Sequence, residues 1–279
     1  MNPGARAEAR LSSLGISAAN EIDMEAIAFD ANMRVQYATL TGCEATLVGV
    51  GSRAIATIRR SGNRGRERFS ISHELGHWDL HRGESFRCRI DDPSENIASD
   101  STKEQEADTY AAHMLMPSWL FNPAIMAIGN PGFNNLQKIA ADFETSLIAT
   151  SLRLVDVHRL PVILVCFRGN KRRWFKRAEG IPVRWWLRSE LDDDSFAYDL
   201  AQGGAAPATP RKQPAEVWFE NDDADQYELL EHCVGHTNGD VLVLLYLIDR
   251  EMLEAGFDPN VGFKKYDEYG VRYTKKARK

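Results

Sequence analysis

The stretch from residue 68 to residue 81, RFSISHELGHWDLH, constrains the fold and the chemistry of this chain more than any other. Its apolar residues recur at helical spacing and predict a helix that buries one face in the core. These apolar residues are Phe69, Ile71, Leu75, Trp78 and Leu80. His73 and His77 are four residues apart, so on a helix they share a face and can reach one cation. A surface helix with two solvated histidines is the simpler interpretation, but a buried histidine pair needs partners.

Glu74 completes an H-E-x-x-H pattern with these two histidines. It lies about 100° round the helix axis from His73, which places its carboxylate beside a water on the metal rather than on the metal itself. Zinc lowers the pKa of such a water towards about 7, and a carboxylate can then take and return the proton. The pattern predicts His73 and His77 as ligands of zinc, with manganese as the alternative metal, and Glu74 as the catalytic base.

A catalytic zinc usually has three protein ligands, and a second predicted helix at residues 102–116 offers candidates for the third. Glu104 and Asp108 are four residues apart on one face of that helix. Glu104 could therefore bind the metal while Asp108 accepts a hydrogen bond from the outer nitrogen of a metal-binding histidine. Glu106 points about 200° away from that face. The sequence favours Glu104 as the third ligand, and solvated acidic residues in a first helical turn are the competing interpretation.

Three further side chains are candidate hydrogen-bond donors to the oxyanion of a tetrahedral intermediate: Tyr110, His81 and His113. His81 lies roughly 12 Å beyond His73 along the same helix, too far to share the metal easily. Nothing in the spacing selects one of the three, and each could equally be a packing or surface residue.

Two runs in this order resemble the signatures of the ImmA/IrrE-type metallopeptidases. The first is the stretch at 68–81, and the second is EQEADTYAAHMLMP at 104–117, in which an acidic stretch leads into Ala-Ala and then Leu-Met-Pro. The likeness covers roughly residues 20–157. It implies a gluzincin-like core in which Glu74 is the base and the metal ligands are His73, His77 and Glu104.

The resemblance also implies a substrate and a role. Members of the family typically cleave a helix–turn–helix transcriptional repressor and so induce genes for stress response, DNA repair or mobile-element transfer. Some members carry an XRE-type repressor domain at the N-terminus. A first helix is predicted at 24–32, where Met24, Ile27 and Ala28 form an apolar stripe. Because only about 20 residues precede it, we expect a repressor that is a separate protein.

Residues 139–154, IAADFETSLIATSLRL, follow the order of a helix–turn–helix, with one helix ending near Phe143 and the next capped by Ser146. Such a unit can read DNA, but here Glu144 replaces the common turn glycine. The second helix would expose Leu147, Ala149 and Thr150, which are poor partners for base edges. We favour a helical module that packs on the protease core, as a similar module does in related proteases, over direct DNA binding.

The remaining pattern completes an α+β fold. Strands are predicted at 35–40, 45–50 and 54–60, and after residue 160 at 161–167, 173–177, 215–219 and 241–248. His232 and His236 are also four apart, but Cys233 stands where a catalytic glutamate would be, and nearby glycines predict a turn. We expect these two histidines to be ordinary.

Three parts are expected along the chain. A zincin-like metallopeptidase domain with a small antiparallel sheet occupies residues 1–130, and a helix–turn–helix-like module occupies residues 131–159. A mixed, β-rich C-terminal domain at residues 160–279 could regulate the protease or recruit its substrate.

Composition narrows the location and the partners. The net charge of -6 argues against a protein that mainly grips nucleic acid. No apolar run approaches the roughly 20 residues that span a bilayer, and the N-terminus lacks the apolar core of a signal peptide. Four cysteines without paired spacing suit a reduced compartment. We expect a cytoplasmic protein with no membrane partner.

Two other function classes stay open. One is a DNA-binding regulator with a vestigial or structural metal site, against which Glu74 argues, because a structural site needs no base. The other is a partner-binding or toxin component of a two-gene system.

Overall fold

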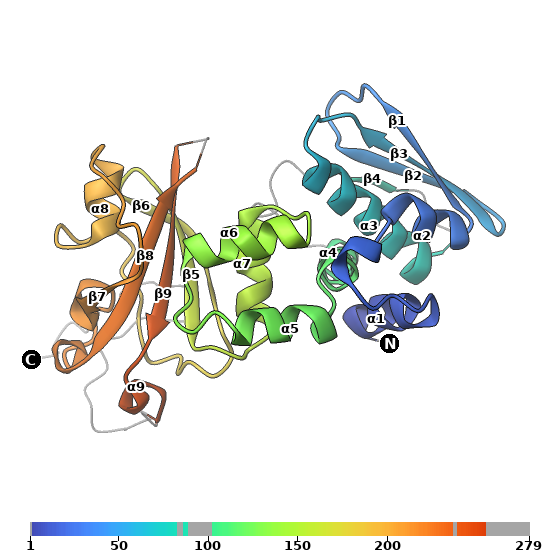
Figure 1. Ribbon diagram of the computed structural model, residues 1–279. Coiled ribbons are helices and arrows are strands. Elements are labelled where there is room, and N and C mark those ends of the chain that lie inside the picture. Colours follow the sequence, from blue (N-terminus) through green and yellow to red (C-terminus); the bar gives the residue numbers. More distant parts are fainter. Residues whose placement is uncertain (1, 83–85, 89–101, 237–238, 255–279) are drawn as a thin grey trace, which may run out of the picture.

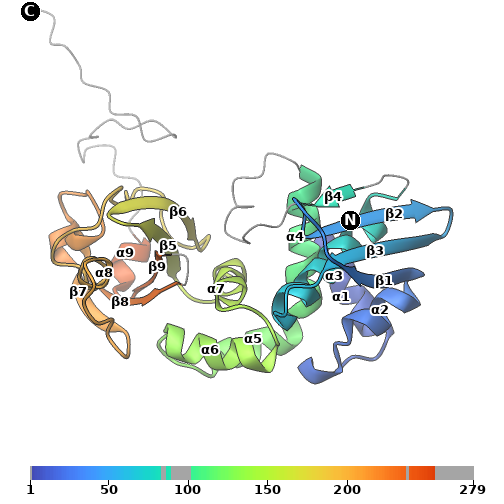
Figure 2. The same cartoon turned by 90° about the horizontal axis from the view of Figure 1, so that it is seen from above.

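A computed structural model describes residues 2–82, 86–88, 102–236 and 239–254 of the 279-residue chain. The chain is α+β, as expected, with a four-stranded sheet in its N-terminal half and a five-stranded sheet in its C-terminal half (Figure 1). Helices lie between the two sheets (Figure 2). Residues 91–101, whose polar sequence with Pro93 predicts a surface loop, lie outside the described residues. In the described ranges, no helix combines the length and apolarity needed to cross a bilayer.

The N-terminal half begins with a helix that the sequence did not suggest. Its elements are α1 (Pro3–Ser13), α2 (Met24–Asp30), β1 (Met33–Ala38), β2 (Ala45–Val50), β3 (Arg53–Arg59), α3 (Arg64–Leu80) and β4 (Phe86–Cys88). The Asn2 side chain caps α1 by accepting from the Ala5 N–H, and Pro3 fits the first turn because it lacks an N–H. The buried residues of α1 are Gly4, Ala7 and Leu11, so Leu11 is its one large apolar side chain in the core. The helix therefore lacks the apolar stripe that identifies a helix in a sequence.

The first sheet is mixed rather than antiparallel throughout, which corrects the expectation. Its order is β1-β3-β2-β4, and β1 pairs with β3 in parallel while the other pairs are antiparallel. The connection at residues 39–44 leads from β1 to β2 and leaves the width of one strand between them. β3 then fills this place and forms a hairpin with β2. Buried Ala54, Ala56 and Ile58 alternate with more exposed residues along β3, so one face of the sheet packs on α3.

Helix α3 is the centre of this half. Asn63 caps it by accepting from the Arg66 N–H, and the stretch from Ser70 to Trp78 is buried throughout. Helix α4 (Thr102–Leu115) packs along α3. The two backbones approach closely at Gly76, where an added Cβ would lie 3.2 Å from the Cα of Ala107. The glycine of the H-E-x-x-H segment is therefore what lets α4 reach the metal-site helix.

Three helices follow: α5 (Ser118–Met126), α6 (Phe133–Asp142) and α7 (Leu147–Asp156). The predicted helix boundaries are confirmed, since α6 ends before Phe143 and the Ser146 side chain caps α7 by accepting from the Ala149 N–H. Thr150 is fully buried rather than exposed, and its hydroxyl lies 2.8 Å from that of Thr145. Most of α7 is enclosed by the protein.

The turn between α6 and α7 is fixed to the first turns of α3. Glu144 adopts a φ of 50°, the left-handed conformation for which glycine is the usual residue. Its Oε2 lies 3.0 Å from Nε of Arg64 and 2.9 Å from a terminal nitrogen of Arg68. The Glu144 carbonyl oxygen would lie 3.1 Å from a Cβ at Gly65. These contacts tie the helix–turn–helix-like pair to the helix that carries the histidines.

The C-terminal half is an antiparallel sheet with order β6-β5-β9-β8-β7. Its elements are β5 (Val162–Arg168), β6 (Lys171–Arg177), α8 (Phe196–Ala201), β7 (Arg211–Pro214), β8 (Glu228–Gly235), β9 (Asp240–Leu247) and α9 (Arg250–Glu254). Helix α7 contacts β5 and β6, and α6 contacts β8. Helix α7 leads directly into β5. The division of the chain into three parts at residues 130 and 159 stays a prediction.

Two expectations for this half were wrong. The strand predicted at 215–219 is a 3-10 turn, η3 (Ala215–Val217), because Trp218 and Phe219 are buried core aromatics that imitate a strand pattern. Strand β8 was missed because polar Glu231 and His232 interrupt it, yet both are buried with partners. His232 Nδ1 accepts from the Phe133 N–H at 2.9 Å and its Nε2 lies 3.0 Å from the Pro207 carbonyl oxygen, a structural role.

Candidate metal centre

The structure brings His73, His77 and Glu104 together between α3 and α4. The two Nε2 atoms are 3.1 Å apart, and the Glu104 carboxylate oxygens lie 3.2 Å from Nε2 of His73 and 3.4 Å from Nε2 of His77. Both histidine side chains are fully buried, whereas that of Glu104 is 28% exposed. Within the described residues, this is the group of His, Cys, Asp and Glu side chains whose ligand atoms lie close enough to hold a metal ion.

Asp108 occupies the position expected of it. Its Oδ1 lies 2.8 Å from Nδ1 of His73. A carboxylate only accepts, so Nδ1 of His73 carries a proton. In the neutral ring Nε2 then has a lone pair directed at the Glu104 side, where it can bind a cation.

The spacing of these atoms suits such a cation. Ligand atoms held about 2.0–2.2 Å from one tetrahedral ion lie about 3.3–3.6 Å apart, close to the three contacts between His73, His77 and Glu104. Burial lowers the pKa of His77. Contacts with both imidazoles hold the pKa of Glu104 well below its usual range. Both shifts favour the deprotonated states of His77 and Glu104 that metal binding requires.

Glu74 lies in the same buried stretch of α3, with none of its surface exposed. As the residue next to His73 it projects from a neighbouring face of the helix rather than from the face of the two histidines. Glu74 is therefore a fully buried carboxylate on the helix that carries both histidines, and its role as the base stays a prediction.

Tyr110 is directed to Asp79 rather than to the ligand group. Its hydroxyl donates to Asp79 Oδ2 at 2.6 Å, and Arg10 of α1 donates two hydrogen bonds to the same carboxylate, at 3.0 and 2.8 Å. Burial and the Asp79 charge raise the pKa of Tyr110. A hydroxyl has one proton, so in this arrangement Tyr110 has none to donate to an oxyanion.

His113 is likewise held by neighbours from other helices. Its Nδ1 lies 2.7 Å from Oε1 of Glu8 in α1, and Arg153 of α7 donates to its Nε2 at 2.9 Å. Burial and the Arg153 charge lower the pKa of His113. The cluster connects α1, α4 and α7, and both nitrogens of the ring are engaged in it.

The spacing predicted that His81 and Glu106 are not metal ligands. The structure places them as a pair next to the ligand group. Nδ1 of His81 lies 3.1 Å from Nδ1 of His77, and Nε2 of His81 lies 2.8 Å from Oε2 of Glu106. The spacing predicted that Glu106 points about 200° away from the face of Glu104 and Asp108, but its carboxylate reaches α3 as theirs do, at His81. The sequence signal for this pair was available, since His81 follows His77 by one helical turn.

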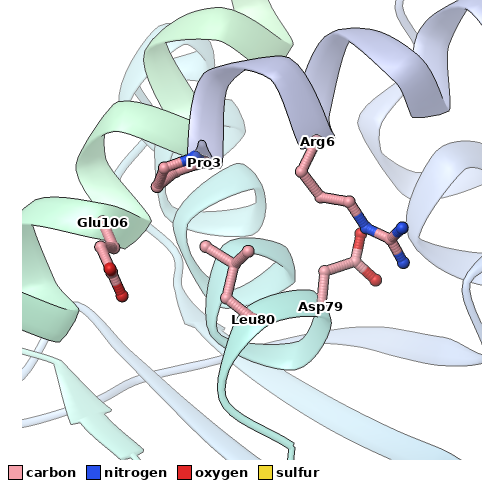
Figure 3. A pocket seen from close by; sticks show the side chains of 5 residues that line it. All are labelled: Pro3, Arg6, Asp79, Leu80 and Glu106. Carbon is pink, nitrogen blue, oxygen red and sulfur yellow. The ribbon is translucent and has the colours of Figure 1, made fainter. Parts of the chain in front are cut away.

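A polar pocket of about 350 Å³ lies beside this pair, where the start of α1 crosses the end of α3. Figure 3 shows Pro3 and Arg6 of α1 above the pocket, Asp79 and Leu80 of α3 below it, and Glu106 of α4 at the left. The role of α1 in this arrangement was not predicted, because nothing in the polar sequence of this helix indicates a contact with Asp79.

Comparisons with known proteins agree with these observations. Residues 34–155 match the family model Peptidase_M78, described as an IrrE N-terminal-like domain. Among solved structures, a transcriptional regulator from Mycobacterium tuberculosis has a similar fold, with a TM-score of 0.60 at 13% sequence identity. The likeness covers 90% of this chain and 77% of that chain. A search of the curated proteins found no match.

Proposed function

We propose that this chain is a zinc-dependent endopeptidase of the ImmA/IrrE type, the family that its two signatures resemble and whose model, an IrrE N-terminal-like domain, residues 34–155 match. The observation that carries the proposal is the meeting of His73, His77 and Glu104, with the fully buried Glu74 next to His73 in the chain. A structural metal site needs ligands alone, whereas a base of the kind we propose for Glu74 is needed only for catalysis.

The residues divide the work of peptide hydrolysis among them. His73, His77 and Glu104 would hold the ion, which when bound would polarise the scissile carbonyl and make a water molecule more acidic. Glu74 takes the proton from the attacking water and delivers it to the leaving amine. Asp108 holds the proton on Nδ1 of His73, which keeps the ring oriented and its Nε2 available.

The ligand chemistry supports zinc over manganese as the ion. Two imidazole nitrogens and one carboxylate are a usual set for catalytic zinc, and they leave a position for water or substrate. Manganese favours sites made mainly of carboxylate, carbonyl and water oxygens. The deprotonated state of His77 and Glu104 fits either ion.

The proposed substrate is a separate XRE-type helix–turn–helix repressor, so that cleavage would release genes for stress response or mobile elements. The family resemblance supports this proposal, and the structural neighbour from Mycobacterium tuberculosis is itself described as a transcriptional regulator. Direct DNA reading is disfavoured because a recognition helix must present its face to a groove, whereas Ile148, Thr150 and Leu154 of α7 are buried. A cytoplasmic location belongs to the same proposal.

The test is co-expression of the full chain with the repressor encoded beside its gene, followed by mass spectrometry of the repressor. Wild type should clip the repressor, and either a chelator or Glu74→Gln should abolish the clipping. Loss of a general base slows a reaction by about 10²–10⁴-fold, so product should fall below detection. Glu190→Gln makes the same chemical change at an exposed position and should cleave like wild type.

Two results would count against the proposal. Clipping that persists in Glu74→Gln would remove Glu74 from the chemistry. An intact repressor with metal-loaded wild type, together with no cut in a broad peptide library, would favour a partner-binding role.

A further inference from the structure

His81 is the C-cap residue of α3, and its side chain lies against His77, one turn earlier in the helix. Its backbone N–H bonds the His77 carbonyl oxygen at 2.8 Å, and its ring centroid lies 5.3 Å from that of His77. Its side chain is only 8% exposed. The ring is thus enclosed between a metal-ligand histidine on one side and Glu106 of α4 on the other.

The two contacts of His81 determine where the protons lie. Glu106 as a carboxylate only accepts, so the 2.8 Å contact places a proton on Nε2 of His81. A neutral His81 then has a bare Nδ1, which must accept the proton on Nδ1 of His77 across 3.1 Å. His77 is left with a bare Nε2, the atom that faces His73 and Glu104.

We propose that His81 and Glu106 are positioning residues of the metal site, acting as a two-step hydrogen-bond relay that fixes the tautomer and the ring orientation of His77. The proposal rests on the metal site proposed above, and it assigns His81 a role other than donor to an oxyanion. With the Nε2 proton given to Glu106, His81 has no second N–H to offer a substrate.

The relay gives each metal-site histidine an acidic anchor on α4. His73 is anchored directly by Asp108 at 2.8 Å, whereas His77 lies one turn farther along α3 and is anchored through His81 by Glu106. Outer partners of this kind orient the ligand ring and raise its basicity. One helix, α4, therefore supplies the third ligand and both anchors.

The outer end of the relay is in contact with solvent. The Glu106 side chain is 42% exposed and lines the pocket at the start of α1 (Figure 3). Water there screens its charge, so the larger part of the effect should depend on the enclosed His81.

The experiment measures zinc affinity of the full chain by competition with a chelator, without any substrate. His81→Asn keeps an acceptor oxygen near the place of Nδ1, and His81→Leu has the same branching without an acceptor. We expect His81→Leu to weaken zinc binding by about 10–100-fold, and His81→Asn to restore most of the loss. Glu106→Gln should weaken it by only a few fold, because its amide oxygen still accepts from His81. His158→Leu, a partly exposed site, is the matched control and should bind like wild type.

Three further readouts separate positioning from stability. Thermal unfolding of the metal-free proteins should not differ between His81→Asn and His81→Leu, and the visible spectrum of the cobalt-loaded protein should change in His81→Leu alone. In the zinc-loaded wild type, nitrogen-15 NMR should find the His81 proton on Nε2.

The outcomes that overturn the relay are distinct from failure of the proposed function. Equal zinc affinity in wild type, His81→Asn and His81→Leu would overturn it, as would equal losses in both variants. A His81 proton on Nδ1 in the zinc-loaded protein would do the same. Wild type that binds no zinc would overturn the proposed metal site itself, and the relay with it.

Discussion

Gly76 lies between the two histidines of the metal site and is the point at which α3 and α4 come closest. In Gly76→Ala the new Cβ would lie 3.1 Å from Cβ of Tyr110 and 3.2 Å from Cα of Ala107. Carbon atoms in ordinary contact are about 3.5–4.0 Å apart, so the neighbours must give by a few tenths of an ångström. Because the Ala107 contact is to the backbone, α4 itself has to move.

The size of the effect follows from two opposing contributions. Overpacking of a well-packed contact costs about 1–3 kcal/mol, whereas alanine stabilises a helix interior by about 0.8–1.0 kcal/mol relative to glycine. The free energy of unfolding should therefore fall by between about 0 and 2 kcal/mol. Metal ligands tolerate displacements of only about 0.2 Å, and Glu104 lies on α4 less than one turn from Ala107. If the strain falls on the ligand, zinc affinity should drop roughly 5–100-fold, since about 1.4 kcal/mol is tenfold.

The assay is urea unfolding of the metal-free protein together with chelator competition for zinc. Gly180→Ala is the matched control, because a Cβ there meets nothing within 4 Å. It should leave zinc affinity unchanged. If Gly76→Ala were instead stabilised by about 1 kcal/mol with unaltered zinc binding, the close approach of α3 and α4 would not be what positions Glu104.

Two further predictions concern buried charges away from the metal. Arg10→Met leaves the Asp79 carboxylate, 1% exposed, without its cation, and should lower the free energy of unfolding by about 3 kcal/mol in urea; a change below about 1 kcal/mol would contradict the pairing. Burial raises the pKa of Glu231 to about 7 despite the hydrogen bond from Trp218, against an ordinary value of 4.5. Because the folded-state pKa is the higher one, its contribution is full below about pH 4.5 and is lost as the pH rises through about 7, a loss of roughly 3 kcal/mol at about 1.4 kcal/mol per pH unit. Unfolding of Glu231→Gln should show a flatter pH profile than wild type, and equal slopes would exclude this titration.

The ligand group could be predicted because its geometry is local. His73 and His77 share a helix face through their spacing alone, and the same holds for Glu104 and Asp108. The need for a third ligand predicted their meeting across two helices, the family resemblance implied it as well, and the structure places His73, His77 and Glu104 together. His81 was considered as a metal ligand, by its distance from His73, and as a donor to an oxyanion, so its position one turn after His77 was overlooked.

The hydrogen-bond partners of Tyr110 and His113 could not be predicted, because these partners lie far away in the sequence. Both contacts involve α1. Tyr110 donates to Asp79, which Arg10 of α1 also contacts, and His113 contacts Glu8 of α1 directly. A short polar helix of this kind shows no periodicity in a sequence. The parallel pairing of β1 was hidden for a similar reason, because alternation within a strand does not reveal its neighbour or its direction.

The contacts of α1 and α7 bear on how this protein can be prepared. A fragment trimmed to the matched segment, residues 34–155, would lose Arg10 and leave the Asp79 carboxylate buried without its counter-ion. At the other end it would stop inside α7, uncovering side chains such as Leu154 and Val155 that have no exposed surface in the whole chain. Such a fragment should aggregate on expression. The region by which the family is recognised is thus shorter than the unit that can be purified.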